Sequence, residues 1–237
     1  MISVCVTTYN GGKYISEQLA SILQQLGADD EVIVSDDGST DDTIALINAI
    51  ADPRIHIINH VQEPVKFKID YSTHNFVNAM NHSHGDVIFL SDQDDCWLPG
   101  KVETMMKALQ HSDLVMSDCA ITDAQLNPIS ASYNALRPFR RGLLSNFIAS
   151  SFLGSCMAFR REVFVAANPF PRYGVAHDIW LGMVALRHFK VDYVSEPLML
   201  YRRHDSTMTA SGKSNTTSLL FKIHYRLYLL KAMLRLL

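Results

Sequence analysis

Short apolar runs alternate with longer amphipathic segments along the first half of the chain, and this alternation limits the folds open to it. We expect strands at residues 2–8, 31–35, 54–59, 87–91 and 114–117, and helices at 14–26, 39–50, 75–83 and 99–110. Strands separated by helices in this way form βαβ units, in which helices cover a parallel sheet. The sequence therefore predicts an α/β fold, with a nucleotide-binding type of sheet over residues 1–118.

The rhythm is looser after residue 119. Residues 119–150 predict a crossover with little regular structure, followed by a strand at 155–160, a helix at 179–188 and closing strands at 191–195 and 198–202. We expect residues 119–205 to pack against the first half, so that one domain spans residues 1–205. A length of 237 residues suits such a domain with an appendage.

Charge is distributed unevenly along the chain. The net charge of −3 provides no basic field, so we expect no nucleic-acid partner. Residues 206–237 nevertheless hold five Lys or Arg residues and no acidic one, which leaves 16 basic and 24 acidic residues before them. An acidic body is therefore followed by a basic tail.

An acidic segment, residues 91–95 (SDQDD), directly follows the apolar strand at 87–90. Three carboxylates so close together repel one another unless a ligand neutralises them. In an extended segment Asp92 and Asp94 point to the same side, about 6.6 Å apart. Oxygen ligands of this kind favour Mg²⁺ or Mn²⁺, which bridge to the phosphates of a nucleotide diphosphate. The alternative is an acidic loop in solvent.

A second acidic segment follows the strand at 31–35. Ser39 or Thr40 suits a helix N-cap, and the two acids after them suit the positive end of the helix dipole. Neither role accounts for Asp36 and Asp37, which stand before the turn. One of these two carboxylates is therefore a candidate ligand donor.

Three further polar segments fall at expected strand or helix ends, where open α/β sheets bind their ligands. Residues 7–12 (TTYNGG) are typical of a turn that caps the next helix, and they could equally form part of a ligand site. Asp178 precedes an apolar helix, where it suits an N-cap equally well. In residues 201–204 (YRRH), the two arginines could be surface charges, and His204 could be a metal ligand or a hydrogen-bond donor to phosphate.

The order and spacing of these segments resemble the family 2 glycosyltransferases of the GT-A fold. The resemblance covers about residues 1–205 and rests on the runs VCVTTYNGG, VIVSDDGSTDDT, GDVIFLSDQDD, GSCMAFRREVF, AHDIWL and YRRH. The longer pattern SDQDD-x-W-LPxK, followed by HDxWL, looks most like the bacterial branch that builds surface polysaccharides such as O-antigen and capsule. Rhamnosyltransferases are prominent in that branch. The resemblance implies a Rossmann-like nucleotide-binding sheet fused to a smaller acceptor-binding half.

The resemblance also implies roles for the nucleotide side of the site. Thr7 and Tyr9 would touch the base, and Asp36 or Asp37 would accept a hydrogen bond from its imide N–H. Asp92 would bind the ribose or support the metal shell. Asp94 matches the family's DxD motif and would coordinate the divalent ion on the diphosphate, while His204 matches a further metal ligand or diphosphate contact.

On the acceptor side, the resemblance implies that Asp178 is the general base. Gly154 and Ser155 match the segment that lines the sugar and acceptor pocket, to which we assign His177 and Arg202 as well. His177 stands where many members of the family have an acidic residue, so that acidic neighbour of the base is missing here.

The implied reaction is a metal-dependent, inverting transfer from a nucleotide diphosphate sugar to a hydroxyl group. The donor would be dTDP-rhamnose or a UDP-hexose, and the acceptor a polyprenyl-diphosphate-linked glycan. Two alternatives are a sugar nucleotidyltransferase and a non-catalytic nucleotide-sugar-binding module. The nucleotidyltransferase would normally carry a basic, Gly-rich loop after the first strand, where this chain has only Lys13.

The tail at residues 218–237 predicts an amphipathic helix with two apolar stripes. One stripe can pack on the body, whereas the other needs a membrane or a second subunit in a homodimer. Basic residues without acidic ones favour an anionic membrane surface. Four scattered cysteines indicate a reducing compartment, and we expect neither a signal peptide nor a transmembrane helix. We therefore expect a cytoplasmic protein, peripheral on the inner face of the cytoplasmic membrane.

Overall fold

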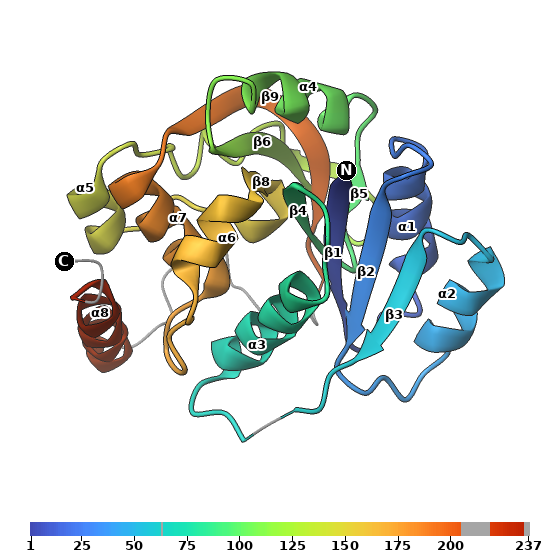
Figure 1. Cartoon of the computed structure of the whole chain (residues 1–237), viewed down its shortest axis with the longest axis horizontal. Coiled ribbons are helices and arrows are strands. Elements are labelled where there is room, and N and C mark those ends of the chain that lie inside the picture. Colours follow the sequence, from blue (N-terminus) through green and yellow to red (C-terminus); the bar gives the residue numbers. More distant parts are fainter. Residues whose placement is uncertain (63, 205–218, 235–237) are drawn as a thin grey trace.

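The computed structural model describes residues 1–62, 64–204 and 219–234, and the side chains of the last segment from residue 224 onward. Its strands form one mixed sheet in the order β3-β2-β1-β4-β8-β6-β9-β5, with β7 added to β6 (Figure 1). The parallel part contains β1 (Ile2–Thr8), β2 (Glu31–Asp36), β3 (Ile55–Asn59) and β4 (Val87–Asp92). The remainder contains β5 (Cys96–Trp97), β6 (Leu114–Thr122), β7 (Pro128–Ser130), β8 (Met157–Arg160) and β9 (Val191–Arg202).

Helices pack on both halves of this sheet. They are α1 (Ile15–Leu23), α2 (Thr43–Ile50), α3 (Lys68–Asn81), α4 (Lys101–Ala108), α5 (Leu143–Ile148), α6 (Arg161–Ala167), α7 (His177–His188) and α8 (Leu219–Met233). Helix α3 packs on β1 and β2, α4 on β6 and β9, and α6 on β8 and α7. A single turn of 3₁₀ helix, Gly154–Cys156, leads into β8.

Strand register places the polar ends of three strands at one edge. β1 and β2 are buried along their whole length, which suits the apolar runs of a parallel sheet covered on both faces. Thr7 lies opposite Ser35 on one side and Asp92 on the other, and Thr8 lies opposite Asp36. The segments after β1, β2 and β4 therefore meet at one edge of the sheet.

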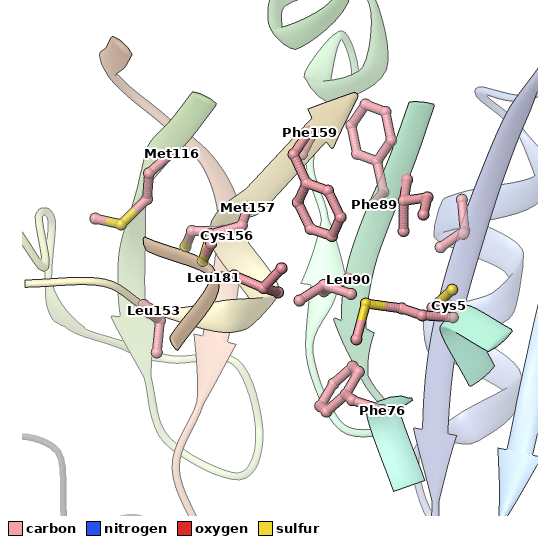
Figure 2. Close-up of a cluster of buried hydrophobic side chains, with 14 of the residues drawn as sticks. Cys5, Phe76, Phe89, Leu90, Met116, Leu153, Cys156, Met157, Phe159 and Leu181 are labelled. Atoms are coloured by element: carbon pink, nitrogen blue, oxygen red, sulfur yellow. The ribbon is translucent and has the colours of Figure 1, made fainter. Parts of the chain in front are cut away.

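A continuous hydrophobic core joins the two halves. Figure 2 shows Cys5 of β1, Leu90 of β4, Phe159 of β8 and Leu181 of α7 within one cluster of buried side chains. β8 pairs with β4 on one side and with β6 on the other. The second half thus extends the first sheet through an antiparallel strand, and the mixed sheet agrees with the predicted α/β class.

Several expected boundaries were wrong. The helix expected at 39–50 begins only at Thr43, because the Ser39 hydroxyl donates to the Asp36 carboxylate and the chain turns there first. α3 begins seven residues before the expected 75, where polar residues hide the helical period. The strand expected at 155–160 begins at Met157, after the 3₁₀ turn. Residues 119–150 are more regular than expected, since they hold the end of β6, β7 and α5.

The two closing strands expected at 191–195 and 198–202 are one strand, β9. The pairing of β9 with β6 shifts register around Asp118, which lies opposite Pro197, so the strand continues through the proline. This long strand carries residues 201 and 202 back to the edge where β4 ends.

Helix α8 packs against the body of the protein beside α5 (Figure 1). The Lys66 ammonium donates to the Tyr228 hydroxyl at 2.5 Å, and an Arg226 N–H donates to the Ile148 carbonyl at 2.6 Å. Leu229 and Ala232 are buried, whereas the side chains of Leu227, Leu230 and Leu234 are exposed. Residues 206–218 and 235–237 of the predicted tail lie outside the described residues. None of the described helices is long and apolar enough to cross a membrane.

Candidate active site

A cavity of about 1890 Å³ opens where β1 and β4 end, and residues from both halves line it. Nine of the predicted site residues line this cavity: Thr7, Tyr9, Asp37, Asp92, Asp94, Gly154, His177, Asp178 and His204. The predicted Asp36, Ser155 and Arg202 lie behind its wall. The structure thus brings together residues that are up to 197 positions apart in the chain.

The loop after β1 is tied to the acidic loop by Gln93, a residue to which the sequence assigned no role. The Gln93 side-chain oxygen accepts from the Thr8 hydroxyl at 2.6 Å and from the Tyr9 amide at 2.8 Å. A Cβ on Gly11 would lie only 2.2 Å from that oxygen, so a larger residue there would displace the Gln93 amide from these contacts. The Tyr9 side chain stays half-exposed at the cavity.

The two acids after β2 have different surroundings. The Asp36 carboxylate accepts hydrogen bonds from the Gly38 amide at 3.0 Å, and from the Ser39 amide and hydroxyl at 2.8 and 2.5 Å. It therefore shapes the turn. Asp37 lines the cavity, and one of its carboxylate oxygens lies 2.5 Å from Nδ1 of His60. Of the two, Asp37 is the one placed to meet a ligand.

Negative charge accumulates where β4 ends. Burial, and next the charge of Asp94, raises the pKa of Asp92 to about 7. Burial and the same neighbour raise the pKa of Asp95 well above its usual range. The Ser155 hydroxyl partly offsets this by donating to the Asp92 carboxylate at 2.5 Å. A bound cation would stabilise these carboxylates further.

The same cluster provides the residues that suit a divalent ion. Nε2 of His204 lies 2.7 Å from the Asp94 carboxylate, and both side chains line the cavity. Within the described residues, no group of three or more His, Cys, Asp or Glu side chains forms a complete metal cage. Mg²⁺ commonly uses only one or two carboxylates together with water and substrate phosphates, so this pair fits an ion shared with a nucleotide.

Two buried cations support the acidic loop from behind. Arg202 donates from Nε to the Asp94 carbonyl at 2.7 Å and from its amide to the Asp95 carboxylate at 3.1 Å, and it pairs with Glu17. Lys101 is fully buried and donates to the Ser155 carbonyl at 2.7 Å. The sequence pattern LPxK contains Lys101 but indicates no role for it.

Another part of the cavity wall is formed by the first turn of α7. Asp178 is the second residue of α7 and lines the cavity, while the N-cap is Ala176. Burial raises the pKa of both Tyr133 and Tyr225. The charge of Asp178 raises both further, while Arg137 partly offsets the shift of Tyr133. Tyr225 comes from α8, so the C-terminal helix contributes to the wall near Asp178.

The sequence model of the family described as Glycosyl transferase family 2 matches residues 3–166. The chain belongs to this family. It is a glycosyltransferase, as the order of its motifs predicted, and the predicted enzyme class is confirmed.

Curated relatives match along most of the chain. The chain is 24% identical to the dTDP-rhamnosyl transferase RfbG of Shigella flexneri, over 93% of this chain and 77% of that protein. It is 26% identical to the GalNAc(5)-diNAcBac-PP-undecaprenol beta-1,3-glucosyltransferase of Campylobacter jejuni, over 90% of this chain and 69% of that protein.

Solved structures share the fold. The structure of S. aureus TarS 1-349 with UDP-GlcNAc superposes with a TM-score of 0.70 at 18% identity, covering 98% of this chain and 66% of that chain. Glucosyl-3-phosphoglycerate synthase from Mycobacterium tuberculosis, solved with Mn²⁺, UDP and glucosyl-3-phosphoglycerate, gives a TM-score of 0.63 at 19% identity. It covers 98% of this chain and 79% of that chain. The predicted GT-A fold of the glycosyltransferases is thereby confirmed.

Proposed function

We propose that this glycosyltransferase uses Mn²⁺ or Mg²⁺ to transfer a sugar, with inversion, from a nucleotide diphosphate sugar to a hydroxyl of a glycan. One observation carries the proposal. Asp92 and Asp94 line the cavity from the first half of the domain, and Asp178 and His204 line it from the second half. A leaving group and an attacking hydroxyl can therefore be held on the two sides of one anomeric carbon.

On the donor side, Thr7 and Tyr9 contact the base, and Asp37 accepts from its imide N–H. Asp92 binds the ribose or supports the metal shell, and Asp94 and His204 hold the ion. When bound, the ion acts as a Lewis acid that offsets charge on the leaving diphosphate. Support comes from the raised pKa of Asp92 and from the 2.7 Å contact between Asp94 and His204.

On the acceptor side, Asp178 takes the proton of the acceptor hydroxyl as that oxygen attacks the anomeric carbon. The bond from this carbon to the diphosphate oxygen breaks in the same step, which inverts the anomeric configuration. Gly154 and His177 line the pocket between the two sides, while Ser155 and Arg202 act from behind the wall by holding the acidic loop. Residues 1–205 form the catalytic domain in this proposal, divided at residue 118.

The donor we favour is dTDP-rhamnose or a UDP-hexose, and the acceptor is a polyprenyl-diphosphate-linked glycan. The names of the Shigella and Campylobacter relatives support these two classes. The alternatives are a sugar nucleotidyltransferase, which would release pyrophosphate, and a binding module, which would release nothing.

We further propose that residues 218–237 attach the protein to the anionic inner face of the cytoplasmic membrane. Two apolar side chains of α8 are exposed, as is Leu234 directly after it, and the neighbouring α5 exposes two more: Leu227 and Leu230 of α8, and Leu144 and Ile148 of α5. α8 has no acidic residue, and Lys231 on it is exposed. The cavity wall includes Ile148 and Tyr225, so a lipid-linked acceptor would reach the cavity from this side. A homodimer through the same face is the alternative.

The test uses the full chain with Mn²⁺, undecaprenyl-diphosphate-linked N-acetylglucosamine and, in turn, dTDP-rhamnose, UDP-glucose, UDP-galactose and UDP-N-acetylglucosamine. We expect release of the nucleoside diphosphate with one donor, loss of release in EDTA, and an inverted anomeric centre by NMR. Pyrophosphate release would indicate the nucleotidyltransferase. Tight nucleotide-sugar binding without any release in every combination would indicate the binding module.

A further inference from the structure

Arginine residues gather in the part of the cavity wall that lies around α5 and α8. Arg137 and Arg140 line the cavity from the segment before α5, and Arg226 lines it from α8. Residues 124–160 contain no acidic residue, and neither does α8. The acidic residue of the cavity that acts on this part of the wall is Asp178. Three guanidinium groups and one carboxylate leave an excess of positive charge, which favours an anionic ligand.

The rest of the cavity shows no such excess. Lys13, Lys68 and Arg203 line it together with the four acidic residues that end or follow β2, β4 and β6. Basic and acidic groups are therefore balanced on the side that holds the proposed ion and nucleotide. The excess of arginine is confined to the side of α5 and α8.

Contacts with the end of α5 hold two of the arginines in place. Arg226 donates to the Ile148 carbonyl at 2.6 Å, and Arg140 donates to the carbonyl of Ala149, the next residue. The two guanidinium groups thus meet adjacent carbonyls. A guanidinium presents five N–H donors in a planar fork, and this shape suits the oxygens of a phosphate.

The third arginine, Arg137, lies near the proposed base. Burial raises the pKa of Tyr225 and the charge of Asp178 raises it further, whereas the charges of Arg137 and Arg226 lower it. The two arginines and the base are therefore neighbours of one tyrosine. This places the arginines on the acceptor side of the cavity.

The order of these groups along the wall matches the order of groups in a lipid-linked acceptor. Ile148 lines the cavity and is exposed, at the edge of the apolar face of α5 and α8 (Figure 1). Arg226 contacts its carbonyl, and Tyr225 and Asp178 come next. In a polyprenyl-diphosphate-linked sugar, the diphosphate likewise stands between the hydrocarbon chain and the sugar.

We propose that Arg137, Arg140 and Arg226 bind the diphosphate of a lipid-linked acceptor. This contact places the first sugar of the acceptor beside Asp178. The inference rests on the proposed function, and it adds a second diphosphate site, apart from the donor diphosphate at Asp94. Asp178 repels an anion, so the diphosphate binds at the arginines and the uncharged sugar lies next to the carboxylate.

Geranyl diphosphate, which carries a lipid chain and a diphosphate without a sugar, is the probe. The full chain is first saturated with Mn²⁺ and with UDP or dTDP, whichever it binds, so that the donor site is occupied. Calorimetry should then show about tenfold weaker binding of geranyl diphosphate by Arg137→Gln and by Arg226→Gln, as for a lost charged hydrogen bond. The Kd of UDP or dTDP should stay unchanged. Arg137 is exposed, so its substitution leaves the core intact.

Arg141→Gln is the matched control, because Arg141 belongs to the same segment but pairs with Asp192 at 2.8 Å, away from the cavity. It should bind geranyl diphosphate as the wild type does. Unchanged binding by both Arg137→Gln and Arg226→Gln would overturn the inference. Equally weakened binding of UDP or dTDP would overturn it too, because the arginines would then hold the donor diphosphate.

Sedimentation with phosphatidylglycerol vesicles separates the acceptor diphosphate from a phospholipid headgroup. Arg137→Gln should sediment as the wild type does. Lost sedimentation with intact binding of geranyl diphosphate would assign the arginine to the headgroup and overturn the inference. A wild type that binds nucleotide but no geranyl diphosphate would overturn the inference alone, and one that binds no nucleotide would overturn the proposed function with it.

Discussion

The hydrogen bond from Ser155 to Asp92 gives a sharp prediction about how the metal and nucleotide are held. Ser155→Ala removes a hydroxyl that donates to a carboxylate at 2.5 Å in a buried setting. Hydrogen bonds to charged groups contribute about 1.5–3 kcal/mol, which corresponds to roughly a 10- to 150-fold change in affinity. Outer hydrogen bonds of metal sites have effects of about 10- to 100-fold, so we expect a loss in that range.

Calorimetric titration of the full chain with UDP or dTDP in the presence of Mn²⁺ measures this loss. Ser72→Ala is the control, because that hydroxyl lines the same cavity from α3. It should leave the Kd unchanged, and thermal unfolding should show that both variants are folded. Wild-type affinity in a folded Ser155→Ala protein would refute the idea that Ser155 holds the Asp92 carboxylate for the ion and nucleotide.

Three further predictions concern the base, the buried histidine and the outer face of α8. Asp178→Asn should reduce transfer by about 10²- to 10⁴-fold with nucleotide affinity retained, and wild-type turnover would contradict the base assignment. Burial lowers the pKa of His177 in the folded protein below the ordinary value of 6.5 that applies to the unfolded chain. At pH values between the folded and unfolded pKa, the unfolded chain binds more protons than the folded protein, so the free energy of unfolding falls as the pH decreases. Urea unfolding at pH 7.5 and 5.5 should therefore show a smaller loss for His177→Gln than for the wild type, and equal losses would contradict this. Leu230→Ser with Leu234→Ser should abolish sedimentation with phosphatidylglycerol vesicles, whereas the exposed Val165→Ser should not. Unchanged sedimentation of the double variant would contradict membrane attachment through this face. So would a wild-type dimer, measured by light scattering, that becomes a monomer in the double variant.

The first half of the fold was predictable because its strands and helices differ strongly in hydrophobic period. β1, β2 and β4 begin and end within one residue of the expected positions. The strands of the second half were predicted less accurately, because they depend on partners far away in the chain. β9 continues through Pro197 only because β6 shifts register beside it, and the sequence of β9 alone cannot show that.

For the candidate site, position at a strand end predicted which acidic residues line the cavity, whereas the hydrogen-bond partners of each side chain could not be predicted. The acids after β4 were identified because their charge is costly beside an apolar strand. Adjacent Asp36 and Asp37 look alike in sequence, yet one completes a turn and the other lines the cavity. Gln93 and Lys101 were assigned no role, because their partners, Thr8 and the Ser155 carbonyl, are set only by the folded chain.

The position of the buried basic residues shows how the acidic loop is supported without an ion pair from Arg202 or Lys101 to the carboxylates that line the cavity. Arg202 and Lys101 both lie behind the cavity wall. Arg202 donates to the Asp94 carbonyl of the loop, whereas Lys101 donates to the carbonyl of Ser155, whose hydroxyl in turn donates to Asp92. Arg202 meets a loop carboxylate only through its backbone amide, to Asp95, while its guanidinium pairs with Glu17. Direct ion pairs with Asp92 or Asp94 would have neutralised the carboxylates that line the cavity. Support through the backbone instead holds the loop in place and leaves its negative charge for a divalent ion and the diphosphate that ion accompanies.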